Sequence, residues 1–132
     1  MAEALSEAIG DELGITVRAR SAGTLGIRES AADPKAIAVC KEVGVDISGH
    51  RSQGISTELI SWADWVLVME LDHASHLREY YPEVGERMLL LGNFAGTAEI
   101  PDPIGGWKWT FRRVRKQLER ALRAVLPRLA SR

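Results

Sequence analysis

Hydrophobic positions recur every three or four residues in several parts of the chain, and this spacing predicts amphipathic helices. Residues 1–13 carry apolar side chains on one helical face and are followed by Gly14, a residue type that commonly ends a helix. Asp33 and Pro34 predict the start of a second helix, because Asp caps a helix and Pro fits its first turn. Three further helices are expected: one capped by residues 56–58 and reaching Ser61, one at residues 71–81 ended by Pro82, and a long one built on Phe111, Val114, Leu118, Leu122 and Val125 that frays near Pro127.

Three other segments have the patterns of strands. Residues 65–69 and 88–91 are continuous apolar runs, typical of strands buried on both faces of a parallel sheet. Residues 15–21 alternate between apolar and polar side chains, which predicts a strand with period two. Residues 92–106 are expected to form a long loop. Helices that alternate with buried strands predict an α/β fold, a sandwich of helices around a parallel sheet.

The length and composition indicate one globular domain over residues 1–132, with 45% hydrophobic residues and no internal repeat. The single cysteine, Cys40, excludes an internal disulfide and suits the reducing cytoplasm. Cys40 and the scattered His50, His73 and His76 are too few for a zinc site, so no metal or cofactor is expected. No apolar stretch is long enough to span a membrane, and a cytoplasmic location is predicted.

Positive charge is concentrated at the C-terminal end of the sequence. Residues 107–132 hold nine Lys or Arg and one acidic residue, a net +8 in a chain whose total charge is −1. A basic helix of this kind could bind nucleic acid, or it could be a solvated helix face. Charged helix faces are common, so we expect a solvated face and no selective nucleic-acid binding.

Several short motifs, each weak alone, occur in order and at regular separations along the chain. By them the sequence resembles the low-molecular-weight protein tyrosine phosphatases over nearly its whole length. The motifs are Met1-Ala2-Glu3-Ala4-Leu5, Ser21-Ala22-Gly23-Thr24, Asp33-Pro34, residues 44–48 with His50-Arg51-Ser52, residues 63–69, and Asp102-Pro103.

The resemblance implies phosphoryl transfer through a cysteinyl-phosphate intermediate. In the family, a Cys-x5-Arg loop supplies the nucleophile and grips the phosphoryl oxygens, and it runs into the helix that begins Met-Ala-Glu-Ala-Leu. The chain starts after that loop, so both residues are expected to be missing from it. Asp102 matches the family's general acid, which protonates the leaving oxygen and then activates water. Read from the residues alone, Pro-Asp-Pro is also a common turn.

Four more residues match places in the family's site. Ile27 and Ile104 stand where tyrosine-directed members carry aromatic rings, so they are expected to line the substrate pocket without stacking. The run Asp-Pro-Ile-Gly-Gly is also similar to that of bacterial protein-arginine phosphatases, which leaves phosphotyrosine and phosphoarginine both open. His50 and Glu70 match a histidine and an acid that brace the phosphate loop, although without that loop they are equally well read as surface residues.

The resemblance also implies a four-stranded sheet of order 2-1-3-4, in which the central first strand is absent from this chain. Unpaired buried amides cost about 1–3 kcal/mol each. We therefore expect the chain to be marginally stable, to re-pair its strands, or to take a strand from a partner or from a second copy in a homodimer.

Two functions follow from these expectations. The first is a phosphatase acting on phosphorylated proteins or small aryl phosphates, of which these 132 residues are an N-terminally truncated, inactive piece. The second is a non-catalytic pseudophosphatase that binds a protein partner. Cys40 is not expected to replace the missing nucleophile, because no arginine follows it at the required spacing and it lies within a predicted helix.

Overall fold

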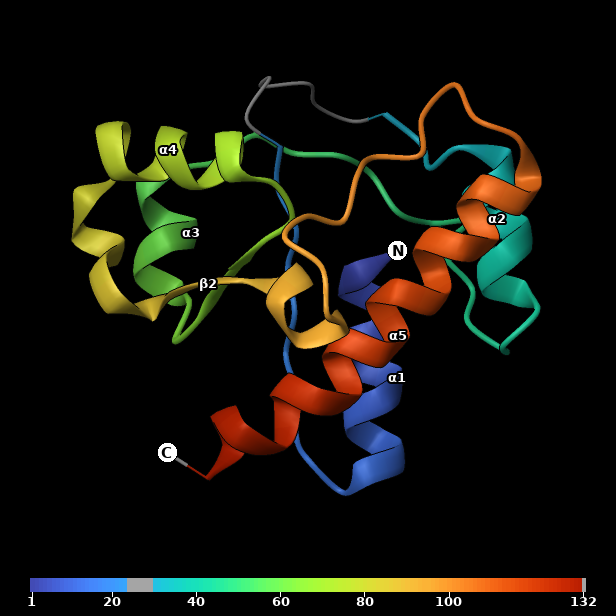
Figure 1. The fold of residues 1–132 in the computed structure, drawn as a ribbon, viewed down its shortest axis with the longest axis horizontal. Helices are drawn as coiled ribbons and strands as arrows, with labels where there is room; N and C mark the ends of the chain where they lie inside the picture. Colours follow the sequence, from blue (N-terminus) through green and yellow to red (C-terminus); the bar gives the residue numbers. More distant parts are fainter. Residues whose placement is uncertain (24–29, 132) are drawn as a thin grey trace.

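The computed structural model describes residues 1–23 and 30–131 of the chain (Figure 1). The alternation of helices and strands predicted from the sequence is confirmed. The elements in chain order are α1 (Ala2–Leu13), α2 (Pro34–Lys41), α3 (Thr57–Trp62), β1 (Val66–Val68), α4 (Leu71–Tyr80), the 3₁₀ helix η1 (Pro82–Arg87), β2 (Met88–Leu90), the 3₁₀ helix η2 (Leu91–Ala95) and α5 (Lys108–Ala130).

Capping side chains begin two of these helices where the sequence predicts. The Asp33 carboxylate accepts a hydrogen bond from the Lys35 amide at 2.8 Å, and Pro34 occupies the first turn of α2. The Ser56 hydroxyl oxygen accepts one from the Leu59 amide at 3.2 Å at the start of α3. Each cap satisfies an amide that the first helical turn leaves without a partner.

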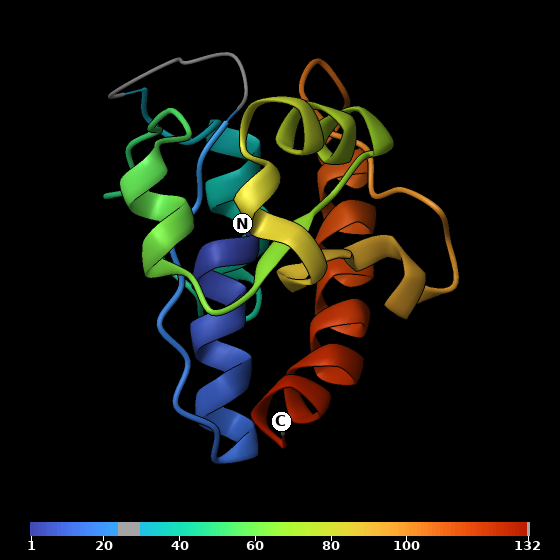
Figure 2. The ribbon, with the colours of Figure 1, turned by 90° about the vertical axis from the view of Figure 1, so that its left-hand side faces the viewer.

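The sheet has helices on both faces. β1 and β2 pair in parallel, with Val66 opposite Met88 and Val68 opposite Leu90. Side chains on one face of this pair pack against α3 and α4 around Leu77. The alternate residues, such as Leu67, face the opposite way and pack against α1 and α5. The result is three layers, with α3 and α4 on one side of the sheet and α1 and α5 on the other (Figures 1 and 2).

Residues 15–21 do not form the predicted strand. Within the described ranges the sheet consists of β1 and β2 alone, and no ladder joins residues 15–21 to either. The Ala19 and Ser21 amides donate instead to the side chains of Glu7 and Glu3 on α1, at 3.1 and 2.8 Å. An alternating pattern forms a strand only beside a second strand, and α1 takes these amides in its absence.

Two boundaries also differ from the prediction. The expected loop over residues 92–106 opens with η2, and Gly92 packs so closely that a Cβ there would lie 2.9 Å from the Thr97 carbonyl oxygen. The long C-terminal helix does not fray at Pro127 but continues to Ala130. Leu126 and Leu129, on either side of the proline, pack in the core shared with α1, and this packing outweighs the lost backbone hydrogen bond.

A buried arginine joins α2 to α5. The guanidinium of Arg115 donates to the Val39 carbonyl oxygen at 2.7 Å and to the carboxylates of Glu42 and Glu119, each at 2.8 Å. Arg112 adds two further hydrogen bonds to Glu42, at 2.8 and 2.6 Å. These bonds hold the C-terminal end of α2 against the first half of α5.

Acidification is expected to break this connection. Hydrogen bonds from Arg112, and then from Arg115, lower the pKa of the Glu42 carboxyl to about 2. The side chain of a free glutamate has a pKa of about 4.3. Glu42 therefore contributes its full stability above pH ~4.5 and loses it as the pH falls toward 2. Urea unfolding between pH 2 and 5 should show a shallower acid dependence in Glu42→Gln than in the parent chain.

The matched control is Glu58→Gln, which neutralises an exposed carboxylate in the first turn of α3. This variant should retain the acid dependence of the parent. An identical acid dependence in Glu42→Gln and the parent would show that the arginine contacts of Glu42 do not couple to folding.

Candidate active site

The loops at the carboxyl end of β1 lie at one edge of the molecule. In Figures 1 and 2 the start of α4, the loop between η2 and α5, and the chain around residues 50–55 all reach the upper edge. The carboxyl edge of a parallel sheet is where open α/β folds place their ligand sites. Four of the five residues predicted for the site lie in these segments, and the fifth, Ile27, lies outside the described residues.

Asp102 lies on the exposed loop before α5 and is fixed by its neighbours. Its amide donates to the Glu70 carboxylate at 3.3 Å, and its own carboxylate accepts from the Ile104 amide at 3.0 Å. Just upstream, the Ile100 amide donates to the Met69 carbonyl oxygen at 2.9 Å, which ties the loop to the end of β1. The structure thus brings Asp102, Glu70 and Ile104 together, and the Asp102 carboxyl group is held at the edge of the sheet.

Two glycines shape the chain directly after Asp102. Gly105 has φ 82°, a left-handed conformation that side chains disfavour. A Cβ on Gly106 would lie 2.9 Å from the Pro103 carbonyl oxygen, and the Gly106 amide donates to that same oxygen at 2.8 Å. The tight turn leaves Ile104 75% exposed beside Asp102. Ile104 is therefore available to contact a ligand at this loop.

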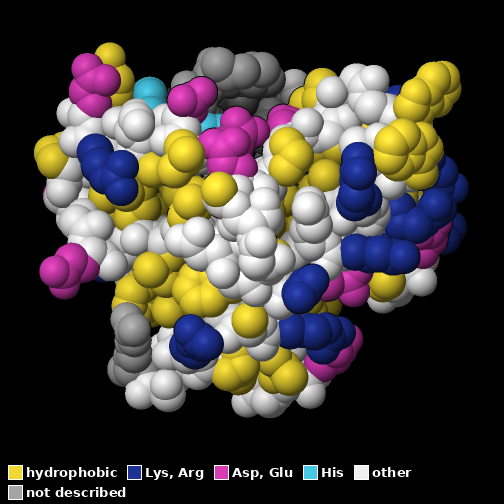
Figure 3. All heavy atoms as spheres, in the orientation of Figure 1, with side chains coloured by type: hydrophobic (Ala, Val, Ile, Leu, Met, Phe, Trp, Pro, Cys, Tyr) yellow, Lys and Arg dark blue, Asp and Glu magenta, His cyan; other side chains and the backbone are white. Residues whose placement is uncertain are grey.

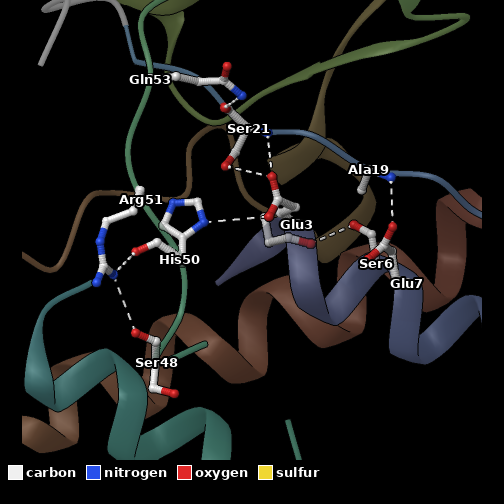
Figure 4. Close-up of polar contacts among 10 residues, drawn as sticks. Glu3, Ser6, Glu7, Ala19, Ser21, Ser48, His50, Arg51 and Gln53 are labelled. Carbon is white, nitrogen blue, oxygen red and sulfur yellow. Dashed lines mark hydrogen bonds and ion pairs between the residues drawn. The ribbon is translucent and has the colours of Figure 1, made fainter. Parts of the chain in front are cut away.

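His50 belongs to a second group of contacts, centred on Glu3 (Figure 4). His50 Nδ1 lies 3.5 Å from one Glu3 carboxylate oxygen. The other oxygen accepts from the Ser21 amide at 2.8 Å and from the Ser21 hydroxyl at 3.2 Å. Gln53 donates from its side chain to the Ser21 carbonyl oxygen at 3.0 Å. α1 is thereby connected to the segments around residues 21 and 50.

Glu3 was not predicted as a site residue, although its contacts are as extensive as those of His50. The sequence signal was its place in the Met-Ala-Glu-Ala-Leu motif, where an acid favours the first turn of a helix. His50 and Ser21 lie far from it in the sequence, so only the fold brings the three together. Within the described ranges, no residue joins the Asp102 group to the Glu3 group through a hydrogen bond or salt bridge.

Cys40 has the environment of a structural cysteine. Its side chain is fully buried in α2 and packs with Val39, Ile47 and Phe111. Burial, the main cause, raises the pKa of the Cys40 thiol, so the reactive thiolate is disfavoured. Cys40 therefore lacks the access and the ionisation that a nucleophile requires.

A groove of about 900 Å³ lies between the segment of residues 15–23 and the segment of residues 62–69, each of which contains a strand predicted from the sequence. Residues 15–23 line one wall, residues 62–69 line the other, and Leu91, Leu122 and Leu126 contribute apolar side chains. β1 forms one wall of this groove and pairs with β2 along its other edge.

The described part of the chain contains neither a metal-binding cluster nor a membrane-spanning helix. Residues 1–23 and 30–131 contain no group of three His, Cys, Asp or Glu side chains placed to hold a metal ion. Within the same ranges, none of the helices has both the length and the apolar composition needed to cross a membrane.

Comparison with known proteins identifies the family. The family described as low molecular weight phosphotyrosine protein phosphatase matches residues 1–132. The tyrosine phosphatase Wzb of Escherichia coli (strain K12) is 36% identical over 107 residues, which cover 81% of this chain and 73% of Wzb. A protein-arginine-phosphatase of Geobacillus stearothermophilus is 36% identical over 105 residues, covering 78% of this chain and 70% of that protein. The chain belongs to the low-molecular-weight phosphotyrosine phosphatase family.

A solved structure supports the fold as well. A mutant of YwlE from Bacillus subtilis superposes with a TM-score of 0.89 at 28% identity, covering 97% of this chain and 87% of the other. The two chains therefore share the α/β fold over nearly all of the 132 residues.

Proposed function

We propose that this protein belongs to the catalytic part of a cytoplasmic protein phosphatase, in which Asp102 is the general acid. The observation that carries the proposal is the fixed position of Asp102, which Glu70 and the end of β1 hold at the carboxyl edge of the sheet. Relatives named as tyrosine and arginine phosphatases support a phosphorylated protein as substrate.

In the proposed reaction, a cysteine thiolate attacks phosphorus and the bond from phosphorus to the leaving oxygen or nitrogen breaks. Asp102 gives its proton to that leaving atom. Its carboxylate then takes a proton from water, and the resulting hydroxide attacks the phosphorus of the cysteinyl phosphate. The bond between sulfur and phosphorus breaks, inorganic phosphate leaves, and the cysteine thiolate is regenerated. The hydrogen bond from the Ile104 amide to Oδ1 fixes the direction of the Asp102 carboxyl throughout.

These 132 residues contain no Cys-x5-Arg pattern that could bind the phosphoryl group. Buried Cys40 does not supply the nucleophile. We therefore propose that the chain as written is inactive and that activity requires a Cys-x5-Arg segment joined to it. The same observation favours the second candidate, a non-catalytic pseudophosphatase that binds a protein partner.

We propose that a further strand binds in the groove between residues 15–23 and residues 62–69. A parallel strand there would use the free edge of β1 and would draw residues 15–21 into the sheet, which gives the order 2-1-3-4. Either the segment that carries Cys-x5-Arg or a partner chain, a second copy included, could supply this strand. Apolar lining by Leu67, Leu122 and Leu126 favours a hydrophobic strand of four to six residues.

For the substrate, we propose a phosphorylated tyrosine or arginine side chain that packs against Ile104. This residue is 75% exposed next to Asp102 and presents apolar surface without an aromatic ring. Ile27 is proposed for the opposite wall of the pocket. His50 and Glu70 are proposed to brace the phosphate-binding segment, His50 from its contact with Glu3 and Glu70 from its bond to the Asp102 amide.

The experiment that tests this function compares two proteins. The 132-residue chain should show no cysteine-dependent hydrolysis of p-nitrophenyl phosphate. A chain extended ahead of Met1 by a hydrophobic strand and a Cys-x5-Arg-Ser-Pro loop should hydrolyse it, and should also unfold at higher urea concentration because the groove is filled. Turnover by the 132-residue chain that is lost in Cys40→Ser would contradict the proposal. So would an extended chain that folds without gaining activity.

A further inference from the structure

One face of α5 consists of cations and a tryptophan. Trp109, Arg113, Lys116 and Arg120 follow one another at spacings of four, three and four residues, which places them on a single side of the helix. All four are exposed. We call these four residues the basic face. Figure 3 shows dark blue Lys and Arg side chains along the course that α5 takes in Figure 1.

Three neighbouring arginines of α5 already form salt bridges with acidic side chains. Arg112 and Arg115 bond to Glu42, and Arg123 pairs with Glu12 of α1 at 2.8 Å. By contrast, the three cations of the basic face form no salt bridge with any acid in the described ranges. The guanidinium of Arg113 lies 5.0 Å over the Trp109 ring, an arrangement that leaves its charge exposed. The positive charge of these three cations is therefore not neutralised by a salt bridge.

The basic face leads directly to the loop that holds Asp102. Its N-terminal end, Trp109, follows Ile104 by five residues in the chain, and Trp107 between them in the sequence is 73% exposed. From Trp109 to Arg120 the helix rises about 16 Å. An extended peptide covers that distance with about five residues. A phosphorylated side chain bound at Asp102 would therefore leave the adjoining residues of its own chain within reach of the basic face.

We propose that the basic face docks an acidic segment of the phosphoprotein substrate, next to the residue that is dephosphorylated. This inference rests on the proposed function, because it uses the position of Asp102 as the place of the chemistry. About five extended residues rich in Asp and Glu match the face in length and in charge.

The acidic residues around the basic face favour a single extended peptide over a broad binding partner. Glu42 and Glu119 lie along one flank of α5, and Glu12 lies at the far end beside Arg123. The sequence before residue 107 carries the excess of acidic residues, since residues 107–132 hold +8 of a total of −1. A DNA duplex or an anionic membrane is broad and would also meet these acids, whereas a single extended peptide contacts the cations alone.

Binding to the 132-residue chain tests the proposal without any need for turnover. The probe is a fluorescein-labelled peptide of alternating Glu and Gly, about ten residues long so that it exceeds the face. Binding measured by fluorescence anisotropy at low salt should weaken at least about tenfold in the double variant Arg113→Glu with Lys116→Glu. The control, Lys41→Glu with Arg78→Glu, makes the same charge change at exposed sites outside α5 and outside the groove, and should stay within about twofold of the parent.

Each other outcome overturns the proposal. Equal weakening in both double variants would show that only net charge matters. Tighter binding of a duplex DNA of equal charge, or of phosphatidylserine vesicles, would assign the face to nucleic acid or membrane. Failure of the proposed function is distinguishable, because the peptide assay reports the face alone and p-nitrophenyl phosphate, which lacks an acidic segment, reports the catalytic residues alone.

Discussion

Replacing Asp102 with Asn is expected to slow turnover of aryl phosphates by about 10²–10⁴-fold, the usual contribution of a general acid. The measurement requires the chain extended with a Cys-x5-Arg loop. Asn keeps a side-chain oxygen that can accept the Ile104 hydrogen bond, so the loop should retain its shape while the proton is lost. The loss should appear mainly in kcat, since Asp102 acts on the leaving oxygen and on water rather than in binding.

Cysteinyl phosphate should still form in Asp102→Asn, and a burst of p-nitrophenol should be visible if its breakdown is the slower step. The matched control is Asp11→Asn, which changes an exposed aspartate near the C-terminal end of α1, outside the groove. That variant should retain the parent kcat. A kcat near that of the parent in Asp102→Asn, at both acidic and neutral pH, would show that Asp102 is only a turn residue.

Replacing Arg115 with Ala is expected to destabilise the fold by about 3 kcal/mol, the lower end of the range for breaking a buried ion pair. The side chain is 7% exposed and bonds to two carboxylates and one carbonyl oxygen. Its removal leaves the Val39 carbonyl oxygen without that donor and opens a gap between α2 and α5. The loss is placed at the lower end because Glu42 and Glu119 are partly exposed and can be rehydrated.

Urea unfolding of three variants separates the causes. Arg115→Met restores the apolar part of the side chain but not its hydrogen bonds, so it should recover only part of the stability. Arg113→Ala removes an exposed arginine from the same helix and should change stability by less than about 0.5 kcal/mol. Equal effects of Arg115→Ala and Arg113→Ala would show that the buried connection contributes nothing beyond helix propensity.

Features that depend on neighbouring residues in the chain could be predicted from the sequence. The caps Asp33 and Ser56 begin helices because their side chains bond to amides two or three residues away. The apolar runs at residues 65–69 and 88–91 contain β1 and β2 because each run carries apolar side chains on both faces, and these pack against the helices on either side of the sheet. The motifs that resemble the phosphatase family could likewise be read from the sequence, and the comparisons confirm the family.

The candidate site was predicted in part for the same reason. Asp102 and Ile104 are two residues apart, so the hydrogen bond between them is local. The glycines at positions 105 and 106 predict the tight turn that exposes Ile104. The bond between the Asp102 amide and Glu70 joins residues 32 positions apart. The sequence suggested both residues through the family resemblance, but it could not show that they touch.

Only the tertiary structure decided the features that require two distant segments to meet. Residues 15–21 have the pattern of a strand, yet a strand needs a neighbour, and the carboxylates of Glu3 and Glu7 take two of its amides instead. In the sequence, the cations after residue 107 form one continuous basic stretch. In the fold, Arg112 and Arg115 pair with Glu42, whereas the basic face stays exposed. A side chain's position in the sequence fixes its face on a helix, whereas its partner depends on which other element packs against that face.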